Sequence, residues 1–146
     1  MARELITFEV DGQHFAIDIM ATREIRAWSP VTRTPGTPAY VAGVINLRGA
    51  VLPVLDLAAR MGWATTAASE RHAIIVAQVG STNAGLIVES VSDIVTLPDG
   101  TLQPPPGGMR GHADCFIEGI AALDDKMIMV INLDSLADAS LGQIAA

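Results

Sequence analysis

The sequence is poor in the residues that several protein classes require. It contains one cysteine, Cys115, among 146 residues, which excludes an internal disulfide framework and suits a reducing cytoplasm. Only 17% of the residues are charged, and the nine Lys and Arg residues form no run while the formal net charge is -7. This charge pattern argues against nucleic acid or an anionic membrane as the principal partner.

Long hydrophobic runs are also missing. No apolar run approaches the roughly 18 residues needed to span a bilayer. The first ten residues, MARELITFEV, lack a signal-peptide pattern and enter an apparent strand almost at once. Half of the residues are nevertheless hydrophobic, and Val, Ile and Thr are abundant, which predicts a mainly β protein. A surface with so few charges indicates that a partner covers some of its apolar area.

An apolar stretch broken by Arg48 and Gly49 organises the chain. The residues on either side predict two strands of a hairpin over 43–57, with Arg48 exposed at its tip and Gly49 at a positive φ. Pro53 cannot donate a ladder hydrogen bond, so we expect an edge strand or a bulge there. Asp56 can cap a short helix over 57–61 that ends at Gly62.

Further strands are expected at 4–10, 13–19 and 72–79, and 83–97 is a long β-rich run. A turn is expected at Asp11-Gly12, and a second hairpin over 116–133 turns at Asp124-Asp125. Thr37 and Pro38 predict the start of another short helix, and Asp134 predicts the cap of a weak helix in the tail.

The chain resembles itself at two places. Residues 10–25 align with 79–94, and residues 43–57 align with 119–133. The repeated order of the hairpins predicts a duplicated β lobe, although few positions are identical and chance similarity is the alternative. Each lobe would hold about five strands, which favours a small barrel. A groove between two such lobes is a common binding place.

Catalytic chemistry has little basis in the sequence. His112 and Cys115 could supply two metal ligands or a Cys/His pair, but a structural zinc site needs four ligands and no second pair has suitable spacing. Glu24 and Asp93 are equivalent in the repeat and could form a carboxylate pair, although two solvated strand residues are the simpler interpretation. We therefore expect no enzymatic activity, no metal and no cofactor. Two alternatives stay open: a small-ligand-binding regulatory β-barrel and an enzyme that uses Cys115 and His112.

Four motifs in order resemble the CheW family of chemotaxis coupling proteins: FEVDGQHFAIDIMATREIR, TPAYVAGVINLRGAVLPVLDL, GLIVESVSDIVTL and IEGIAALDDKMIMVINLDSL. The resemblance runs from about residue 4 to 137. It implies that residues 1–146 form a single CheW-like domain of mainly β class, with two small five-stranded β-barrel (SH3-like) lobes that share a hydrophobic core, and with short helices. The lobes would cover about 10–62 and 72–136, with exchange of strands between them left open.

The resemblance also implies a non-enzymatic adaptor that couples chemoreceptors to a chemotaxis-type histidine kinase. One surface would bind the regulatory domain of a CheA-type histidine kinase, and another would bind the cytoplasmic tip of a chemoreceptor. The protein would be cytoplasmic and recruited to receptor arrays at the inner membrane, with no nucleic acid partner and no direct membrane insertion.

Site residues follow from the family motifs. The receptor tip would lie in the groove between the lobes, where Arg48 either pairs with a receptor carboxylate or orients the hairpin internally. The expected receptor-binding residues are Thr22, Ile25, Gly43, Arg48, Val88, Val91 and Ile94. For the kinase, we expect contacts on the hairpin at Val44, Val51 and Leu52.

Overall fold

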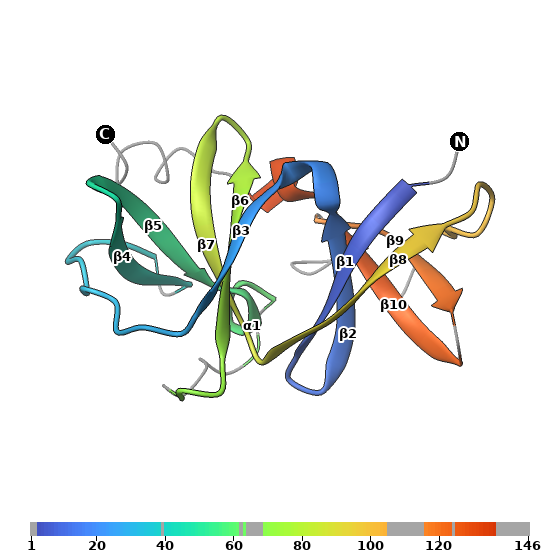
Figure 1. The fold of residues 1–146 in the computed structure, drawn as a ribbon, viewed down its shortest axis with the longest axis horizontal. Helices are drawn as coiled ribbons and strands as arrows, with labels where there is room; N and C mark the ends of the chain where they lie inside the picture. The colour runs from blue at the N-terminus through green and yellow to red at the C-terminus, as the bar shows by residue number, and fades with distance from the viewer. Residues whose placement is uncertain are drawn as a thin grey trace.

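The computed structural model describes residues 3–38, 40–61, 63, 69–104, 116–123 and 125–136. Strands dominate it, and the helical segments are single turns (Figure 1). The elements are β1 (Arg3–Val10), β2 (Gln13–Asp18), η1 (Ile19–Ala21), β3 (Thr22–Ala27), β4 (Val41–Leu47), β5 (Ala50–Asp56), α1 (Leu57–Arg60), β6 (Ala73–Val79), β7 (Thr82–Val88), β8 (Ser90–Leu97), β9 (Ile117–Leu123), β10 (Lys126–Ile131) and η3 (Leu133–Leu136).

The strands form two five-stranded sheets that lie side by side (Figure 1). The first sheet has the order β8-β1-β2-β10-β9, and the second has the order β3-β6-β7-β5-β4. Replacing β1 to β5 by β6 to β10, and the reverse, converts one order into the other. The repeat in the sequence is therefore also a repeat in topology. The lobe limits 10–62 and 72–136 stay a prediction, because hydrogen-bonded sheets alone do not define a lobe.

Each sheet combines strands from both halves of the chain: β1 and β2 with β8, β9 and β10 in the first, and β3, β4 and β5 with β6 and β7 in the second. The first sheet begins with β8, which pairs with β1, and the second begins with β3, which pairs with β6. Two crossings connect the sheets in the middle of the molecule, one through η1 and one at Glu89. The mainly β class and SH3-like lobes that the sequence predicts are confirmed.

The predicted barrels are not closed by backbone hydrogen bonds among the described residues. The first sheet ends at β8 and β9, and the second ends at β3 and β4. Side chains span the sheets instead. Arg3 of β1 forms an ion pair with Glu118 of the edge strand β9, and Arg48 in the β4–β5 turn forms one with Glu24 of the edge strand β3.

The hydrophobic core has three parts, because the central strands are buried on both faces. Along β5, Val54 belongs to a cluster inside the second sheet, whereas its neighbour Leu55 belongs to a large cluster between the sheets. Their repeat counterparts in β10 behave alike: Val130 lies inside the first sheet and Ile131 in the central cluster. Alternation along a strand with two buried faces gives this arrangement. The central cluster joins the two sheets into one core.

Local turn chemistry agrees with the sequence. Asp11 and Gly12 have φ of 51° and 76°, and Arg48 and Gly49 have φ of 51° and 88°. Two successive residues at positive φ form the tight turn whose twist matches antiparallel strands. Asp56 caps α1 as predicted, since its side chain accepts hydrogen bonds from the backbone N–H groups of Ala58 and Ala59. Gly62, the predicted end of that helix, lies outside the described residues.

Pro53 was expected to mark an edge strand or a bulge, and this prediction is wrong. β5 lies between β7 and β4. Pro53 is opposite Val44, whose N–H and C=O both bond to Thr32 and so point away from β5. The pairing of β5 with β7 begins only at Val54. Pro53 therefore occupies an inner strand at a position where no ladder hydrogen bond is required.

One helix prediction is wrong, and a second, in the tail, is wrong in its cap and otherwise lies outside the described residues. No helix begins at Thr37 and Pro38; instead the Thr37 hydroxyl donates to the Thr34 carbonyl within a loop. Near the C-terminus, Asn132 rather than Asp134 supplies the cap of η3, because the Asn132 Oδ1 accepts the Asp134 N–H at 3.1 Å. The tail beyond residue 136 lies outside the described residues.

Candidate functional site

The two edge strands β3 and β8 carry matching irregularities. The pairing of β3 with β6 skips Arg23, and the pairing of β8 with β1 skips Ser92. Arg23 and Ser92 are equivalent in the repeat. A bulge in an edge strand changes the direction of the side chains that follow and discourages indiscriminate strand pairing.

Two isoleucines follow these bulges and lie on the surface. Ile25 is 48% exposed and Ile94 is 55% exposed, and they are equivalent in the repeat. Ile25 is the cross-strand partner of Ile75, which belongs to the central cluster. Since cross-strand partners share one face of a sheet, Ile25 extends the central apolar face to the edge of the second sheet. Val91, in β8 of the first sheet, is half-buried and packs against the same cluster.

Two other residues of the predicted receptor surface have different surroundings. Val88 is 1% exposed and belongs to the central cluster, so it supports the surface from beneath and does not reach solvent. Thr22 is half-buried, and its hydroxyl donates to the Asp18 carbonyl at 3.3 Å. That bond holds the crossing from η1 into β3.

Arg48 has an internal partner. Its Nη2 lies 2.7 Å from Oε1 of Glu24, and the two side chains are 74% and 29% exposed. The turn itself is fixed by the Gly49 N–H, which donates to Oδ1 of Asn46 at 2.8 Å. From the sequence, Glu24 and Asp93 were expected to be either a carboxylate pair or, more simply, two solvated strand residues. The Asp93 carboxylate instead accepts the N–H of Ile94.

Gly43 is buried, and the close approach of another backbone segment explains why this position holds a glycine. A Cβ atom at this position would lie 2.2 Å from the carbonyl oxygen of Thr32. Its repeat counterpart Gly119 has the same surroundings, with a Cβ position 2.6 Å from the Gln103 carbonyl oxygen. In each lobe the preceding loop therefore crosses directly over a glycine of the first hairpin strand.

The predicted kinase contacts divide between core and surface. Leu52 is 8% exposed and packs inside the second sheet, and the backbone groups of Val44 are bonded to Thr32. Val51 alone of the three has a largely free side chain, at 52% exposure. Its repeat counterpart Met127 is 63% exposed, so both hairpins present an apolar side chain just after their turn.

Other chemistry is poorly represented in the part of the chain that the structure describes. This part contains no group of three or more His, Cys, Asp or Glu residues that could hold a metal ion. His112 and Cys115 lie outside the described residues. The interiors of both sheets are filled by their own apolar clusters. Among the described segments, none is a helix long and apolar enough to cross a membrane.

A family model described as the CheW-like domain matches residues 4–140. The chain belongs to the CheW-like family. The match includes every strand of both sheets except the first residue of β1, and so covers the two isoleucine edges and both hairpins.

Named relatives agree with this assignment. The chain is 50% identical over 134 residues to the chemotaxis protein CheW of Rhizobium meliloti (strain 1021), covering 92% of this chain and 86% of that protein. It is 30% identical to the chemotaxis protein CheW of Bacillus subtilis (strain 168), covering 97% and 91%. The crystal structure of the scaffolding protein TtCheW from Thermoanaerobacter tengcongensis matches with a TM-score of 0.84 and 34% identity, covering 93% of this chain and 92% of that one.

Proposed function

We propose that the protein is a non-enzymatic adaptor that couples chemoreceptors to a CheA-type histidine kinase, so that receptor state controls kinase activity. The observation that carries the proposal is the match to the CheW-like domain over residues 4–140, together with 50% identity to a chemotaxis CheW protein. The relatives are named as chemotaxis or scaffolding proteins, and a scaffold needs surfaces rather than a catalytic centre.

The receptor tip docks on the edge strands β3 and β8 in this proposal. Ile25 and Ile94 are the exposed apolar side chains there, and Val91 continues the surface toward the central cluster. A helical receptor tip can lay an apolar face on such a surface. Val88 and Gly43 keep the surface in shape from within, whereas Thr22 holds the start of β3.

Arg48 acts in this surface through Glu24. The ion pair ties the β4–β5 turn to β3, and β3 and β4 are the two edge strands of the second sheet. Because Ile25 follows Glu24 directly, the pair fixes the part of β3 that presents Ile25. We therefore favour the orienting role of Arg48 over a direct contact with a receptor carboxylate.

The kinase regulatory domain contacts the far side of the second sheet, around Val51. The edge of β4 is partly occupied, since Thr32 bonds both backbone groups of Val44. Addition of a kinase strand to that position is blocked, so side chains must provide the contact. Val51 is exposed for this purpose, and Leu52 supports it from the core.

This role places the protein in the cytoplasm, at receptor arrays on the inner membrane. The test is reconstitution from purified parts: the full chain, a receptor cytoplasmic fragment and the kinase with its regulatory domain. Size-exclusion chromatography should show a complex of all three, and receptor control of kinase autophosphorylation should require the chain. Failure to bind either partner at micromolar concentration would refute the proposal.

A further inference from the structure

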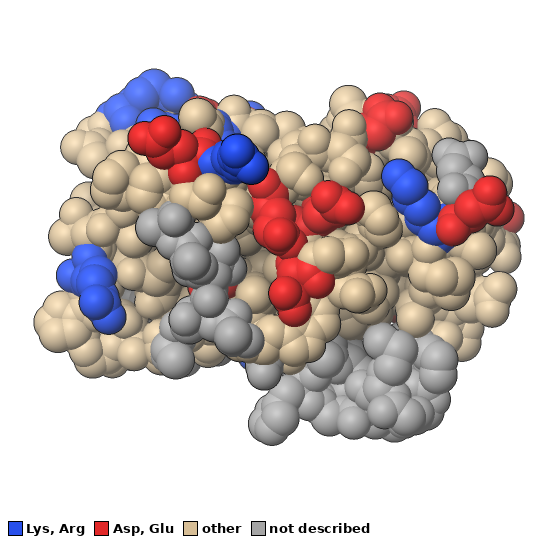
Figure 2. Space-filling model, turned by 90° about the horizontal axis from the view of Figure 1, so that it is seen from below, with Lys and Arg blue, Asp and Glu red and all other residues tan. Residues whose placement is uncertain are grey.

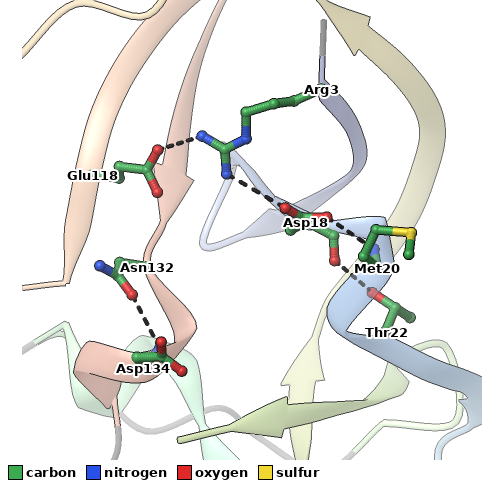
Figure 3. Close-up of polar contacts among 7 residues, drawn as sticks. All are labelled: Arg3, Asp18, Met20, Thr22, Glu118, Asn132 and Asp134. Carbon is green, nitrogen blue, oxygen red and sulfur yellow. Dashed lines mark hydrogen bonds and ion pairs between the residues drawn. The ribbon is translucent and has the colours of Figure 1, made fainter. Parts of the chain in front are cut away.

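A hollow of about 380 Å³ lies beside η1 and η3, and none of its lining residues belongs to the receptor or kinase surfaces assigned above. Side chains from both sheets line it. Arg3, Asp18 and Glu118 come from the first sheet, Gln78 comes from the second, and Met20 and Asp134 come from the two 3-10 turns. Figure 3 shows how most of these side chains gather around the same opening.

Carboxylates outnumber cations in this hollow. Arg3 lies between two of them, in an ion pair with Glu118 and with its Nη2 3.7 Å from Oδ2 of Asp18 (Figure 3). Asp134 is exposed, and no other described residue forms a hydrogen bond or ion pair with its carboxylate; only its backbone N–H is bonded, to Asn132. The single guanidinium thus leaves negative charge in the hollow without a partner.

The opposite end of the molecule shows a contrast. Asp and Glu side chains also gather near the middle of the face seen from below (Figure 2). At the β1–β2 turn and the β7–β8 junction, which lie at the bottom of Figure 1, the carboxylates have internal partners. Glu89 accepts the Gly12 N–H at 2.8 Å, and Glu9 accepts the Ser90 hydroxyl at 3.1 Å. Those carboxylates serve the β1–β2 turn and the β7–β8 junction, whereas Asp134 has no such internal use.

An apolar anchor lies beside the unpartnered charge. Met20 is 81% exposed, the highest value among the large hydrophobic residues of the described chain. Its backbone is held in place, because the Met20 N–H donates to Oδ1 of Asp18 at 2.9 Å. A flexible thioether on a fixed turn adapts to the shape of a partner, and an exposed methionine of this kind is common at binding surfaces.

We propose that this hollow binds a cationic segment of a partner protein, in which an arginine or lysine enters beside Asp134 and a neighbouring apolar residue packs on Met20. Charge complementarity carries the choice of occupant, since the lining has three carboxylates against one guanidinium and the whole chain has a net charge of -7. The surface differs from the proposed receptor and kinase surfaces, so the inference goes beyond the coupling function and does not depend on it.

The test uses the full chain and two blocked tripeptides, acetyl-Leu-Arg-Leu-amide and the same peptide with citrulline, which has the shape of arginine without its charge. Nuclear magnetic resonance titration should show shifts of the Met20, Ala21 and Leu133 amides with the arginine peptide and much smaller ones with citrulline. Equal shifts with both peptides, no shifts at millimolar concentration, or shifts elsewhere would overturn the proposal.

Asp134→Lys is the decisive variant, because it changes an exposed carboxylate that forms no hydrogen bond or ion pair with any other described residue. The variant should weaken binding of the arginine peptide by about three- to tenfold, as expected for loss of an exposed ion pair. Met20→Ser should weaken the binding of both peptides. The matched control is Glu70→Lys, an exposed position before β6, at the opposite end of that strand from Gln78. If Glu70→Lys weakened binding as much as Asp134→Lys, the effect would be one of net charge and the assigned hollow would be wrong.

Discussion

Arg48 and Glu24 lie 24 positions apart in the sequence and form an ion pair of 2.7 Å that joins a hairpin turn to an edge strand. Both residues belong to the first copy of the repeat, and the tie lies in the second sheet. In the repeat, Glu24 corresponds to Asp93 and Gly49 to Asp125, and the second hairpin has no arginine at its turn. The fold can thus be built without the pair, which makes the pair a candidate for function.

Reversing the charge of Arg48 should separate an orienting role from a direct one. Arg48→Glu should weaken receptor binding because it places two carboxylates together, while its cost in folding free energy should stay within about 1 kcal/mol, since the pair is exposed. The double variant Glu24→Arg with Arg48→Glu restores an ion pair and should recover most of the binding. Calorimetric titration with a receptor-tip fragment measures both. A double variant as weak as Arg48→Glu alone would instead indicate that Arg48 touches the receptor.

Exposed and buried hydrophobic residues of the proposed receptor surface should respond differently to substitution. Ile94→Ser removes an exposed side chain, so receptor binding should fall while the melting temperature stays nearly unchanged. Val88→Ala removes buried volume and should cost about 2 kcal/mol of stability. Thermal unfolding and receptor binding are measured on both variants. Normal receptor binding by folded Ile94→Ser would exclude this residue from the interface.

Val51 provides a test of the kinase surface alone. Val51→Glu places a charge on an exposed apolar position and should reduce binding of the kinase regulatory domain, while receptor binding and folding persist. Met127→Glu is the matched control, because Met127 is the exposed repeat counterpart in the other lobe. Binding of the isolated regulatory domain to each variant, measured by calorimetry, checks the expectation; equal losses for both would mean that the surface has not been located.

Gly43 should tolerate no side chain. Gly43→Ala would bring a methyl group to 2.2 Å from the Thr32 carbonyl oxygen, and we expect a loss of about 3 kcal/mol of stability. Gly100→Ala is the control: its φ is 83° with nothing within 4 Å of the added atom, so it should lose only about 1 kcal/mol from backbone strain. Urea unfolding compares the two, and similar losses would contradict a steric role for Gly43.

Asp56 should stabilise α1 through its cap. Asp56→Ala removes the acceptor of the Ala58 and Ala59 N–H groups at a position only 4% exposed, and should lower stability by about 2 kcal/mol. Asp56→Asn keeps a cap oxygen and should retain more of the stability. Chemical unfolding of both variants measures the difference.

Local signals in the sequence were sufficient for the hairpins. Asp11-Gly12 and Arg48-Gly49 form tight turns because residues that accept positive φ lie between runs that favour strands. The cap at Asp56 was predictable for the same reason, since its partners are two and three residues away. The errors at Pro53 and Asp134 arose where the decisive neighbour was non-local or where two residues competed for one cap.

The surface residues were predictable only in part. The family motifs pointed to Ile25, Ile94 and Arg48, which are exposed. They could not distinguish the exposed Val51 from the buried Leu52 or Val88. That distinction depends on which face of a strand is covered. For Ile25 and Ile94, the bulges at Arg23 and Ser92 also shift the alternation by one residue. A period of two in the sequence does not reveal such a shift.

The sequence by itself determined the β class, the repeat, the main turns and the family, because each depends on neighbours along the chain or on the order of motifs. Tertiary structure alone decided that β3 and β8 would pair with strands of the other repeat, that Glu24 would meet Arg48, and that Asp134 would be left beside Met20 at a hollow. Arg60 is a further example, with its guanidinium 4.7 Å from the Tyr40 ring centre and 4.9 Å from that of Phe116. The physical reason is that these contacts form between segments far apart in the chain, and only the packing of two sheets around one central core brings them together.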